Sequence, residues 1–344
     1  MVIFTNKLLI NLKHISEATH FQLPNVHEAA NSLTAIKKSN IEQTMTPIWT
    51  LCFFIAYSIE INAQNELAII DANSGLRLAV LNKNFPLLKI LLPNQSNSER
   101  GIEVEFPEHV TGLNEQTKTV EHLYLVTRGN LNNRTLPVWK MENNTLIYET
   151  ELNGNIKMIA RAQLESNGVR YSYKFTNHSN ISYQNFQAVT CVKLYSAFSD
   201  TLLKRTYVHH TNGFDLLASE TPERLTMPLR KWLPCRYLVS YNWPIASKRI
   251  EKDEDSITRY YKSRRADQPF IATLSHDKNW VAATYTSETG NLWTNPERSC
   301  QHADPSISLN TNETKTLRLT TFLYKGTLDS LLKYVAREKQ RKQD

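Results

Sequence analysis

The sequence has little glycine and little cysteine, and both shortages exclude classes of protein. Its 344 residues include nine glycines, and neither a Walker loop nor a G-x-G-x-x-G pattern occurs, so phosphate-cradling loops are not expected. The four cysteines have no C-x-x-C spacing, so a thiolate zinc site is not indicated. G-x-S-x-G and H-E-x-x-H patterns are absent as well. The familiar signatures of nucleotide binding, hydrolase and metalloprotease chemistry are therefore missing.

The number of charged residues is ordinary, and the net charge is mildly positive. Charged residues make up 21% and apolar residues 41% of the chain, with a formal net charge of +7. This composition fits neither a disordered chain nor a polytopic membrane protein. A basic surface attracts polyanions such as acidic or sulfated glycans, although +7 also suits an ordinary soluble surface. The basic blocks are short (262–265 and 337–342) and we expect export, so we expect no nucleic-acid partner.

Long apolar runs are also lacking, except for one near the N-terminus. Ile48–Ile59 is a stretch of 12 residues without charge, whereas a membrane-spanning helix needs about 20. The run has the size of a signal-peptide core, and Ala63 stands where cleavage before Gln64 is expected. We expect 1–44 to be a mis-called extension, 45–63 a signal peptide and 64–344 a single domain. The alternative is a buried N-terminal helix.

The expected location is secreted or periplasmic, with no stable membrane span once the signal is cleaved. Cys52 lies in the signal, so Cys191, Cys235 and Cys300 remain in the mature chain. An odd number of cysteines in an exported protein leaves at least one free thiol or a bond to another chain.

The mature chain reads as a succession of β-strands. Asn153-Gly154 and Asn167-Gly168 supply the turn residues of hairpins, and residues 169–176 alternate apolar with polar, which indicates one buried face. We therefore predict a three-stranded meander over 145–176. Many strands without intervening helices must bury their faces sheet against sheet. The predicted fold class is all-β, a large antiparallel β-sandwich of the supersandwich kind.

One helix is expected at the C-terminus. Leu328, Leu331, Leu332 and Val335 recur at the spacing of one helical face. The sandwich should therefore carry a single C-terminal amphipathic helix.

Two long excursions between strands, 196–233 and 287–315, are predicted to hold the functional residues, since loops on a β scaffold usually do. The first carries His209, Glu220 and Arg224. In the second, His302 and Asp304 lie two residues apart and share one face if the chain is extended. Such a pair serves as an oriented acid/base couple or as two metal ligands.

The candidate catalytic residues are His302, Asp304, His209 and Glu220. The candidate ligand-binding residues are Trp293, whose ring would stack on a sugar, and Arg265 and Arg224, which would hold carboxylates or sulfates. The plainer interpretation is that the histidines pack or form loop hydrogen bonds and that most aromatic residues are core. The metal and the cofactor, if any, remain unknown.

Three segments carry a resemblance to known proteins: residues 205–244, 263–275 and 289–309, the last reading TGNLWTNPERSCQHADPSISL. They resemble an uncharacterised group of exported bacterial proteins, which implies export but transfers no catalytic residue. More loosely, residues 156–194 resemble the β-supersandwich of galactose-mutarotase-like proteins, many of which act on sugars.

Two functions follow as hypotheses. The first is an exported protein that binds or processes a carbohydrate through a loop site at one sheet edge. The second is a non-catalytic binding or scaffolding module on the cell surface. A histidine and a carboxylate brought together in a concave pocket would favour the first hypothesis, and scattered residues on a flat surface would favour the second.

Overall fold

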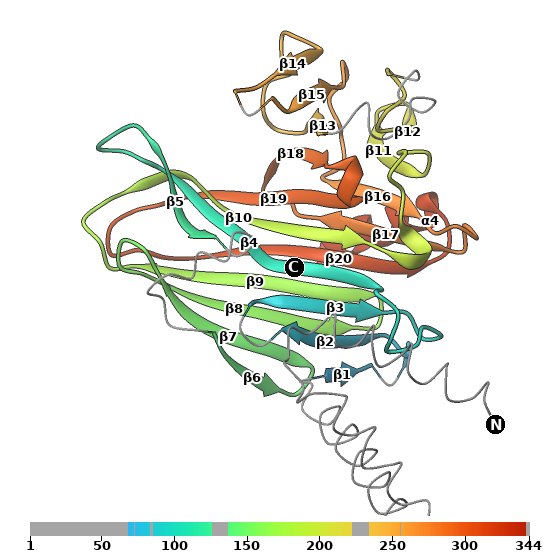
Figure 1. Cartoon of the computed structure of the whole chain (residues 1–344), viewed down its shortest axis with the longest axis horizontal. Coiled ribbons are helices and arrows are strands. Elements are labelled where there is room, and N and C mark those ends of the chain that lie inside the picture. The colour runs from blue at the N-terminus through green and yellow to red at the C-terminus, as the bar shows by residue number, and fades with distance from the viewer. Residues whose placement is uncertain are drawn as a thin grey trace, which may run out of the picture. The chain divides into compact units, whose positions relative to one another are not determined.

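A computed structural model describes residues 68–71, 73–82, 85–125, 137–221, 234–254 and 256–341. Two large sheets make up this part of the chain (Figure 1). Sheet 1 has the order β1-β2-β3-β4-β10-β19-β18-β13-β15-β14, with β5 also paired to β4. Its strands are β1 (Ala68–Ile70), β2 (Arg77–Asn82), β3 (Leu87–Leu91), β4 (Ile102–Asn114), β5 (Val120–Leu125), β10 (Tyr183–Leu194), β13 (Cys235–Ser240), β14 (Ile250–Lys252), β15 (Thr258–Tyr261), β18 (Thr289–Thr294) and β19 (Cys300–Leu309).

Sheet 2 has the order β12-β11-β16-β17-β20-β9-β8-β7-β6. Its strands are β6 (Val138–Glu142), β7 (Thr145–Leu152), β8 (Ile156–Glu165), β9 (Gly168–Asn177), β11 (Thr206–His210), β12 (Gly213–Leu216), β16 (Phe270–Leu274), β17 (Trp280–Tyr285) and β20 (Thr314–Lys325). Its described pairs are all antiparallel, whereas β13 and β15 of sheet 1 run parallel. The predicted all-β sandwich is confirmed.

The predicted meander is present as β7, β8 and β9, paired in continuous register. Alternate residues of β9, from Val169 through Tyr171 and Tyr173 to Phe175, are fully buried. They pack against sheet 1 residues such as Phe186 in the main core. The alternation of the sequence therefore marks the face that this hairpin array turns toward the other sheet.

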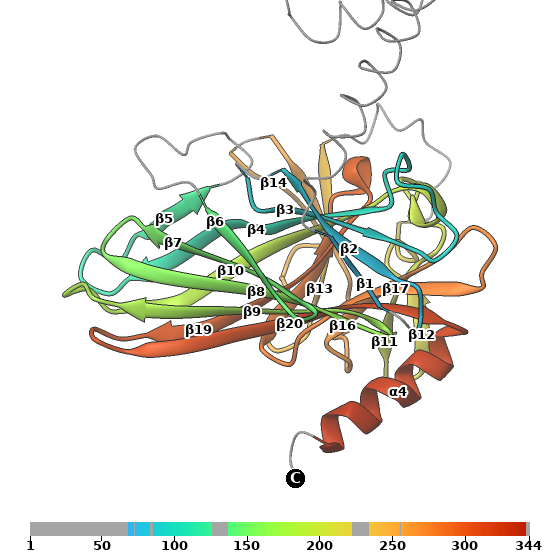
Figure 2. The same ribbon diagram turned by 90° about the horizontal axis from the view of Figure 1, so that it is seen from below.

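The predicted helix is α4 (Leu328–Arg341), and it begins where the apolar spacing places it. Leu331 and Val335 are buried against Phe270, Val281 and Ala283 of sheet 2. Ala282, between the last two, belongs to the core between the sheets. The helix therefore covers the outer face of sheet 2, and Figure 2 shows it outside both sheets.

Both predicted excursions contain strands, so two organisational predictions are wrong. Residues 196–233 include β11 and β12, and β11 pairs with β16 in sheet 2. Residues 287–315, expected to form a long excursion, contain two strands, β18 and β19, and a short 3₁₀ turn, Pro296–Arg298. β19 pairs with β10 on one side and with β18 on the other. Pro296, Pro305 and the polar residues suggested a loop, but tertiary pairing overrides that local signal. Trp293, His302 and Asp304, predicted on a loop at a sheet edge, lie instead in the interior of sheet 1.

The predicted extension (1–44) and signal peptide (45–63) lie outside the described residues, as does Arg224. Among the residues that the structure describes, no helix is both long and apolar enough to cross a membrane.

Candidate functional site

Alternate side chains of β19 point to opposite faces of sheet 1. The Gln301 side chain is hydrogen-bonded to Thr284 and Thr273 of sheet 2, so it faces the interior of the sandwich. His302 and Asp304, offset by one residue, therefore lie on the face turned away from sheet 2. The prediction that these two side chains share one face is confirmed.

A cavity of about 550 Å³ opens on this outer face of sheet 1. It crosses the sheet from β5 to β15, so its walls come from segments far apart in the sequence. Its lining is His109, Val120, Gln187, Val189, Arg236, Leu238, Trp243, Arg259, Gly290, Asn291, Trp293 and Asp304. Of the predicted site residues, Trp293 and Asp304 line this cavity.

Asp304 is held in place by two donors. The Trp293 indole donates Nε1–H to Asp304 Oδ2 at 2.8 Å, and the Thr190 backbone N–H donates to Oδ1 at 3.1 Å. Thr190 lies where the pairing of β10 with β4 is irregular, between Val189 and Cys191, and its amide turns to the carboxylate. A carboxylate fixed by two donors is rigidly oriented toward the cavity.

His302 lies beneath the cavity wall and does not line it. The Trp293 ring stacks on the His302 ring with centroids 3.6 Å apart and planes 11° apart. His302 is fully buried; its Nε2 lies 3.3 Å from Cys300 Sγ, and its Nδ1 lies 3.6 Å from Asp304 Oδ1. His302 cannot touch a ligand in the cavity unless Trp293 moves. It therefore supports Trp293 and Asp304 from behind the cavity wall.

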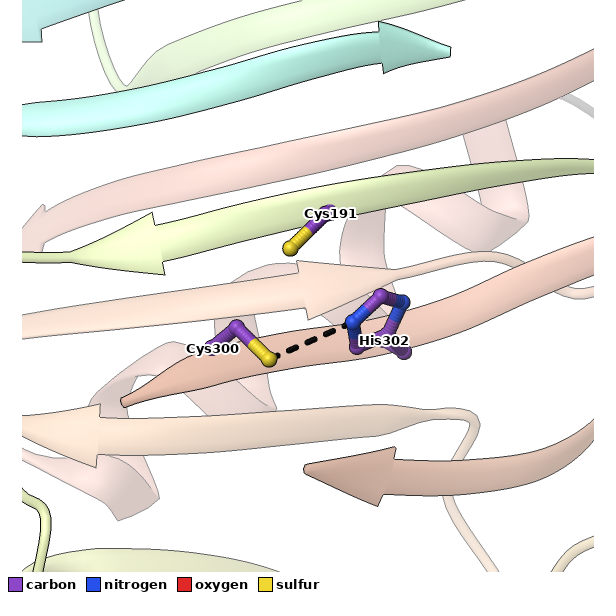
Figure 3. A group of neighbouring side chains, drawn as sticks. All are labelled: Cys191, Cys300 and His302. Atoms are coloured by element: carbon purple, nitrogen blue, oxygen red, sulfur yellow. Dashed lines mark hydrogen bonds between the residues drawn. The ribbon is translucent and has the colours of Figure 1, made fainter. Parts of the chain in front are cut away.

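Cys191, Cys300 and His302, which we call the Cys–His cluster, meet on the outer face of sheet 1 (Figure 3). Burial by itself raises the pKa of the Cys300 thiol, but contacts with Cys191 and His302 lower it well below its usual range. Burial opposes charge on His302, yet Cys300 and Asp304 raise the pKa of the ring above its usual range. The pKa of the Cys191 thiol is raised by its contact with Cys300 and by burial.

Two arginines bring positive charge to the cavity. The Arg236 guanidinium carbon lies 5.0 Å from the centre of the Trp293 ring, and among the described residues its buried Nε finds no hydrogen-bond acceptor. Arg259 forms an ion pair with Asp253 at 3.0 Å. The buried Asn291 Oδ1 likewise has no donor in the described part of the chain. Two residues that line the cavity thus each carry a buried polar atom that has no hydrogen-bond partner among the described residues.

His109 contributes a neutral imidazole. Burial lowers its pKa to about 4, against a smaller opposing effect of the Asp304 charge. At neutral pH the ring therefore carries no charge and offers one acceptor and one donor nitrogen. The neighbouring Glu108 has a raised pKa, also because of burial.

Trp243 forms part of the cavity wall because residue 290 is glycine. A Cβ built on Gly290 would lie 1.9 Å from Trp243 Nε1, so the indole rests on the glycine backbone. The backbone N–H groups of Tyr241 and Asn242 donate to Gly290 O at 2.8 and 3.0 Å, which anchors the turn. Trp243 keeps 39% of its surface exposed, and an exposed indole face is suited to stacking on a sugar ring.

The other predicted site residues do not join this cavity. His209 on β11 is bonded through Nδ1 to Asp267 Oδ1 at 2.6 Å. Glu220 accepts from Ser263 N and Oγ and forms an ion pair with Arg249. The backbone oxygen of Arg265 accepts from the His210 ring at 2.8 Å. The cavity therefore brings Trp293 and Asp304 together but includes neither His209 nor Glu220.

Several lining residues escaped the sequence analysis: His109, Gln187, Arg236 and Asn291. Each sits on a different strand, and no local spacing connects them. The sequence offered one weak signal for them. On strands whose alternate positions are core, these polar residues occupy the positions in between.

No protein-family model matches the chain. A search of curated proteins also finds no match.

Solved structures do show similarity. A protein from Synechocystis is 11% identical, with a TM-score of 0.45, over 76% of this chain and 96% of the other. A galactose mutarotase-like protein from Lactobacillus casei is 9% identical, with a TM-score of 0.45, over 76% and 100%. A putative aldose 1-epimerase from Escherichia coli is 9% identical, with a TM-score of 0.44, over 76% and 100%. At these identities and TM-scores we rest no functional argument on the similarity.

Proposed function

We propose that the protein binds an acidic saccharide, a sugar that carries a carboxylate or sulfate, in the cavity on the outer face of sheet 1. The observation that carries this proposal is the Arg236 guanidinium, which lines the cavity beside the Trp293 ring and whose Nε has no acceptor in the described part of the chain. A guanidinium with a free N–H suits a planar anionic group. Trp243, with part of its indole exposed, supplies an apolar face for the sugar ring, and Asn291 and Gln187 supply hydrogen bonds to hydroxyl groups.

The charge balance of the lining supports an anionic ligand. Arg236 and Arg259 are positive and His109 is neutral, while Asp304 is the one carboxylate among the lining residues. Asp304 already accepts from Trp293 and Thr190, which offsets part of its repulsion of an anion. A neutral sugar would leave the Arg236 donor unpaired, so acidic sugars should bind more tightly than their neutral counterparts.

The test is calorimetric titration of the full chain with matched oligosaccharides that are neutral, carboxylated or sulfated. An acidic saccharide should bind, and added salt should weaken it. Arg236→Gln should weaken binding roughly 10- to 100-fold, because a hydrogen bond to a charged group contributes about 1.5–3 kcal/mol. Arg161→Gln is the matched control, since Arg161 is exposed on β8 of sheet 2.

Gly290→Ala is a second variant that removes no polar group. Its added Cβ would displace the Trp243 indole, so saccharide binding should fall while the free energy of unfolding changes less. If the folded protein binds none of the saccharides, or binds them equally well without Arg236, the proposal fails. A non-catalytic scaffolding role would then be favoured over saccharide binding.

A second candidate function, sugar processing, rests on His109. A neutral imidazole and the oriented Asp304 carboxylate line the same cavity, and such a pair is suited to proton transfer. If a saccharide binds, exchange of its hydrogens for deuterium in D₂O, followed by NMR, would reveal proton abstraction. His109→Gln should then abolish exchange without abolishing binding.

Export is part of the proposal as well. The apolar run Ile48–Ile59 and the alanine before Gln64 support it. N-terminal sequencing of the protein recovered from the host of origin should read from Gln64; an N-terminus at Met1 or Met45 would contradict cleavage.

A further inference from the structure

Three metal-binding side chains converge in the Cys–His cluster. One ligand atom each from Cys191, Cys300 and His302 lies within 4.8 Å of the other two, and Cys300 Sγ lies 3.3 Å from His302 Nε2. All three residues are at most 1% exposed. Two sulfur atoms and an imidazole nitrogen are the ligands that zinc prefers in proteins.

The strand register explains why these residues meet. Cys300 and His302 are two residues apart on β19 and therefore share a face. On the neighbouring β10, Val192 pairs with Gln301, so Cys191 lies across from His302. Figure 3 shows the Cys191 sulfur turned toward the other two side chains. A separation of more than one hundred residues hid the cluster from a search for C-x-x-C spacing.

We propose that Cys191, Cys300 and His302 bind one Zn²⁺ ion, with water as the fourth ligand. Zinc–sulfur distances of about 2.3 Å and zinc–nitrogen distances of about 2.0 Å place tetrahedral ligand atoms roughly 3.5–3.8 Å apart. The 3.3 Å between Cys300 Sγ and His302 Nε2 is close to this geometry. The remaining separations are at most 4.8 Å, so side-chain rotation can bring the ligand atoms to these distances.

Charge favours this ligand set in a buried place. Two thiolates and a neutral imidazole balance the double positive charge of zinc, so the site as a whole is neutral. A neutral site avoids most of the desolvation cost of a buried ion. Binding requires two thiolates and a neutral imidazole, so protons leave the cluster when zinc enters, and zinc affinity should therefore rise with pH.

The surroundings of His302 are those of a metal ligand. Its Nδ1 has no hydrogen-bond partner among the described residues, but faces Asp304 Oδ1 at 3.6 Å. Histidines that bind a metal through one nitrogen usually direct the other nitrogen to a carboxylate, which fixes the ring. Asp304 is itself fixed by Trp293 and Thr190. A small closure of the Nδ1–Oδ1 distance would complete that arrangement.

A second possible group is less favourable. Glu105, Glu108 and Cys191 also offer three ligand atoms within 4.8 Å of one another. Glu105 is already ion-paired with Lys193, and that pair would have to break. The set with two sulfurs and an imidazole is therefore the better zinc site.

The zinc would lie behind the cavity wall. His302 stacks on Trp293, so an ion that fixes His302 also fixes the ring that lines the cavity. The proposed role is structural, and it does not depend on whether the cavity binds a saccharide.

Metal analysis of the full chain, purified under reducing conditions without added sugar, tests the proposal. About one zinc per chain is expected to survive dialysis, and a chelator should lower the melting temperature. Replacement of zinc by Co²⁺ should give thiolate-to-cobalt charge-transfer absorption and the intense visible bands of a tetrahedral site.

Cys300→Ser and His302→Gln should lose the zinc and the cobalt bands. Cys235→Ser is the matched control, because Cys235 is also buried but belongs to a core outside the cluster. If a cluster variant fails to fold, the cobalt spectrum of the unaltered chain still decides. Folded, reduced protein that takes up neither zinc nor cobalt would overturn the proposal, and so would cobalt bands that persist in Cys300→Ser.

Discussion

Two groups of buried polar atoms differ in how completely they are hydrogen-bonded. Lys262, 3% exposed at its side chain, follows β15 of sheet 1 and bonds to Asp215 on β12 of sheet 2. Its Nζ donates to Asp215 Oδ2 at 2.5 Å, Ser219 Oγ at 2.6 Å and Leu216 O at 3.0 Å. The three N–H donors of the Lys262 ammonium group thus have three acceptors, and we call these residues the Lys262 network. No donor of Lys262 remains for a ligand.

The outer face of sheet 1 is different. Arg236 Nε, Asn291 Oδ1 and His302 Nδ1 are buried and have no partner among the described residues. Unpaired buried groups cost free energy, so they are rare unless a ligand, an ion or water completes them. The comparison teaches that charge and burial do not by themselves mark a site. A site is marked by polar atoms that lack a hydrogen-bond partner next to a cavity. Arg236 and Asn291 are such residues, because both line the cavity.

The largest expected effect lies in the Lys262 network. Lys262→Met should lower the free energy of unfolding by about 3 kcal/mol, because it leaves Asp215 and Ser219 without their cationic partner. Urea unfolding at pH 7 measures this loss. Saccharide binding and zinc content should stay unchanged. A loss below about 1 kcal/mol would show that the Lys262 network does not stabilise the fold.

The next effect tests the outer face. Trp293→Phe keeps a ring over His302 but removes the Nε1–H donor to Asp304. A hydrogen bond to a charged group contributes about 1.5–3 kcal/mol, and a loss of that order is expected in urea unfolding. Saccharide affinity should fall too, since Asp304 is no longer fixed. Unchanged stability together with unchanged affinity would contradict the proposal that the Trp293 indole N–H fixes Asp304.

His109 gives a pH dependence. Its pKa is about 4 in the folded chain and about 6.5 when unfolded, so the unfolded state binds the proton first as pH falls. This contribution to stability is full above pH 6.5 and is lost progressively between pH 6.5 and 4. Relative to His109→Gln, the unaltered chain should lose about 2 kcal/mol between pH 7.5 and 4.5. Parallel losses in both proteins would refute the lowered pKa.

The smallest effect is expected at an exposed ion pair. Lys157 and Glu149 are 3.0 Å apart, with 50% and 41% of their side chains exposed. Lys157→Met should change the free energy of unfolding by less than about 1 kcal/mol, because water screens such pairs. This variant is also the baseline for Lys262→Met. If the two variants had equal effects, burial would not distinguish them.

Parts of the fold could be predicted from local pattern alone. The meander over 145–176 and the helix from Leu328 follow from side-chain periods of two and of 3.6, which are set by neighbours in the sequence. The prediction failed for 287–315, where proline and polar residues suggested a loop. β18 and β19 form there because flanking strands supply hydrogen-bond partners and a cavity and cluster accommodate the polar side chains.

The candidate site was predictable only in fragments. His302 and Asp304 were correctly placed on one face, since extended chain repeats every two residues. Cys191 and Arg236 could not be assigned to them, because strand order and register decide which distant residues become neighbours. His209 and Glu220, grouped with them in the prediction, do not line the cavity, and each is bonded within its own surroundings.

The sequence by itself determined the β character of this protein, the alternation that makes one face of each strand core, and the terminal helix. These features depend on contacts between residues close in sequence. Tertiary structure alone decided that β10, β18 and β19 would lie side by side. That arrangement brought two cysteines and a histidine to one point, and it left Arg236 Nε without an acceptor in the described part of the chain. Sheet pairing does this because it joins residues that no local pattern connects.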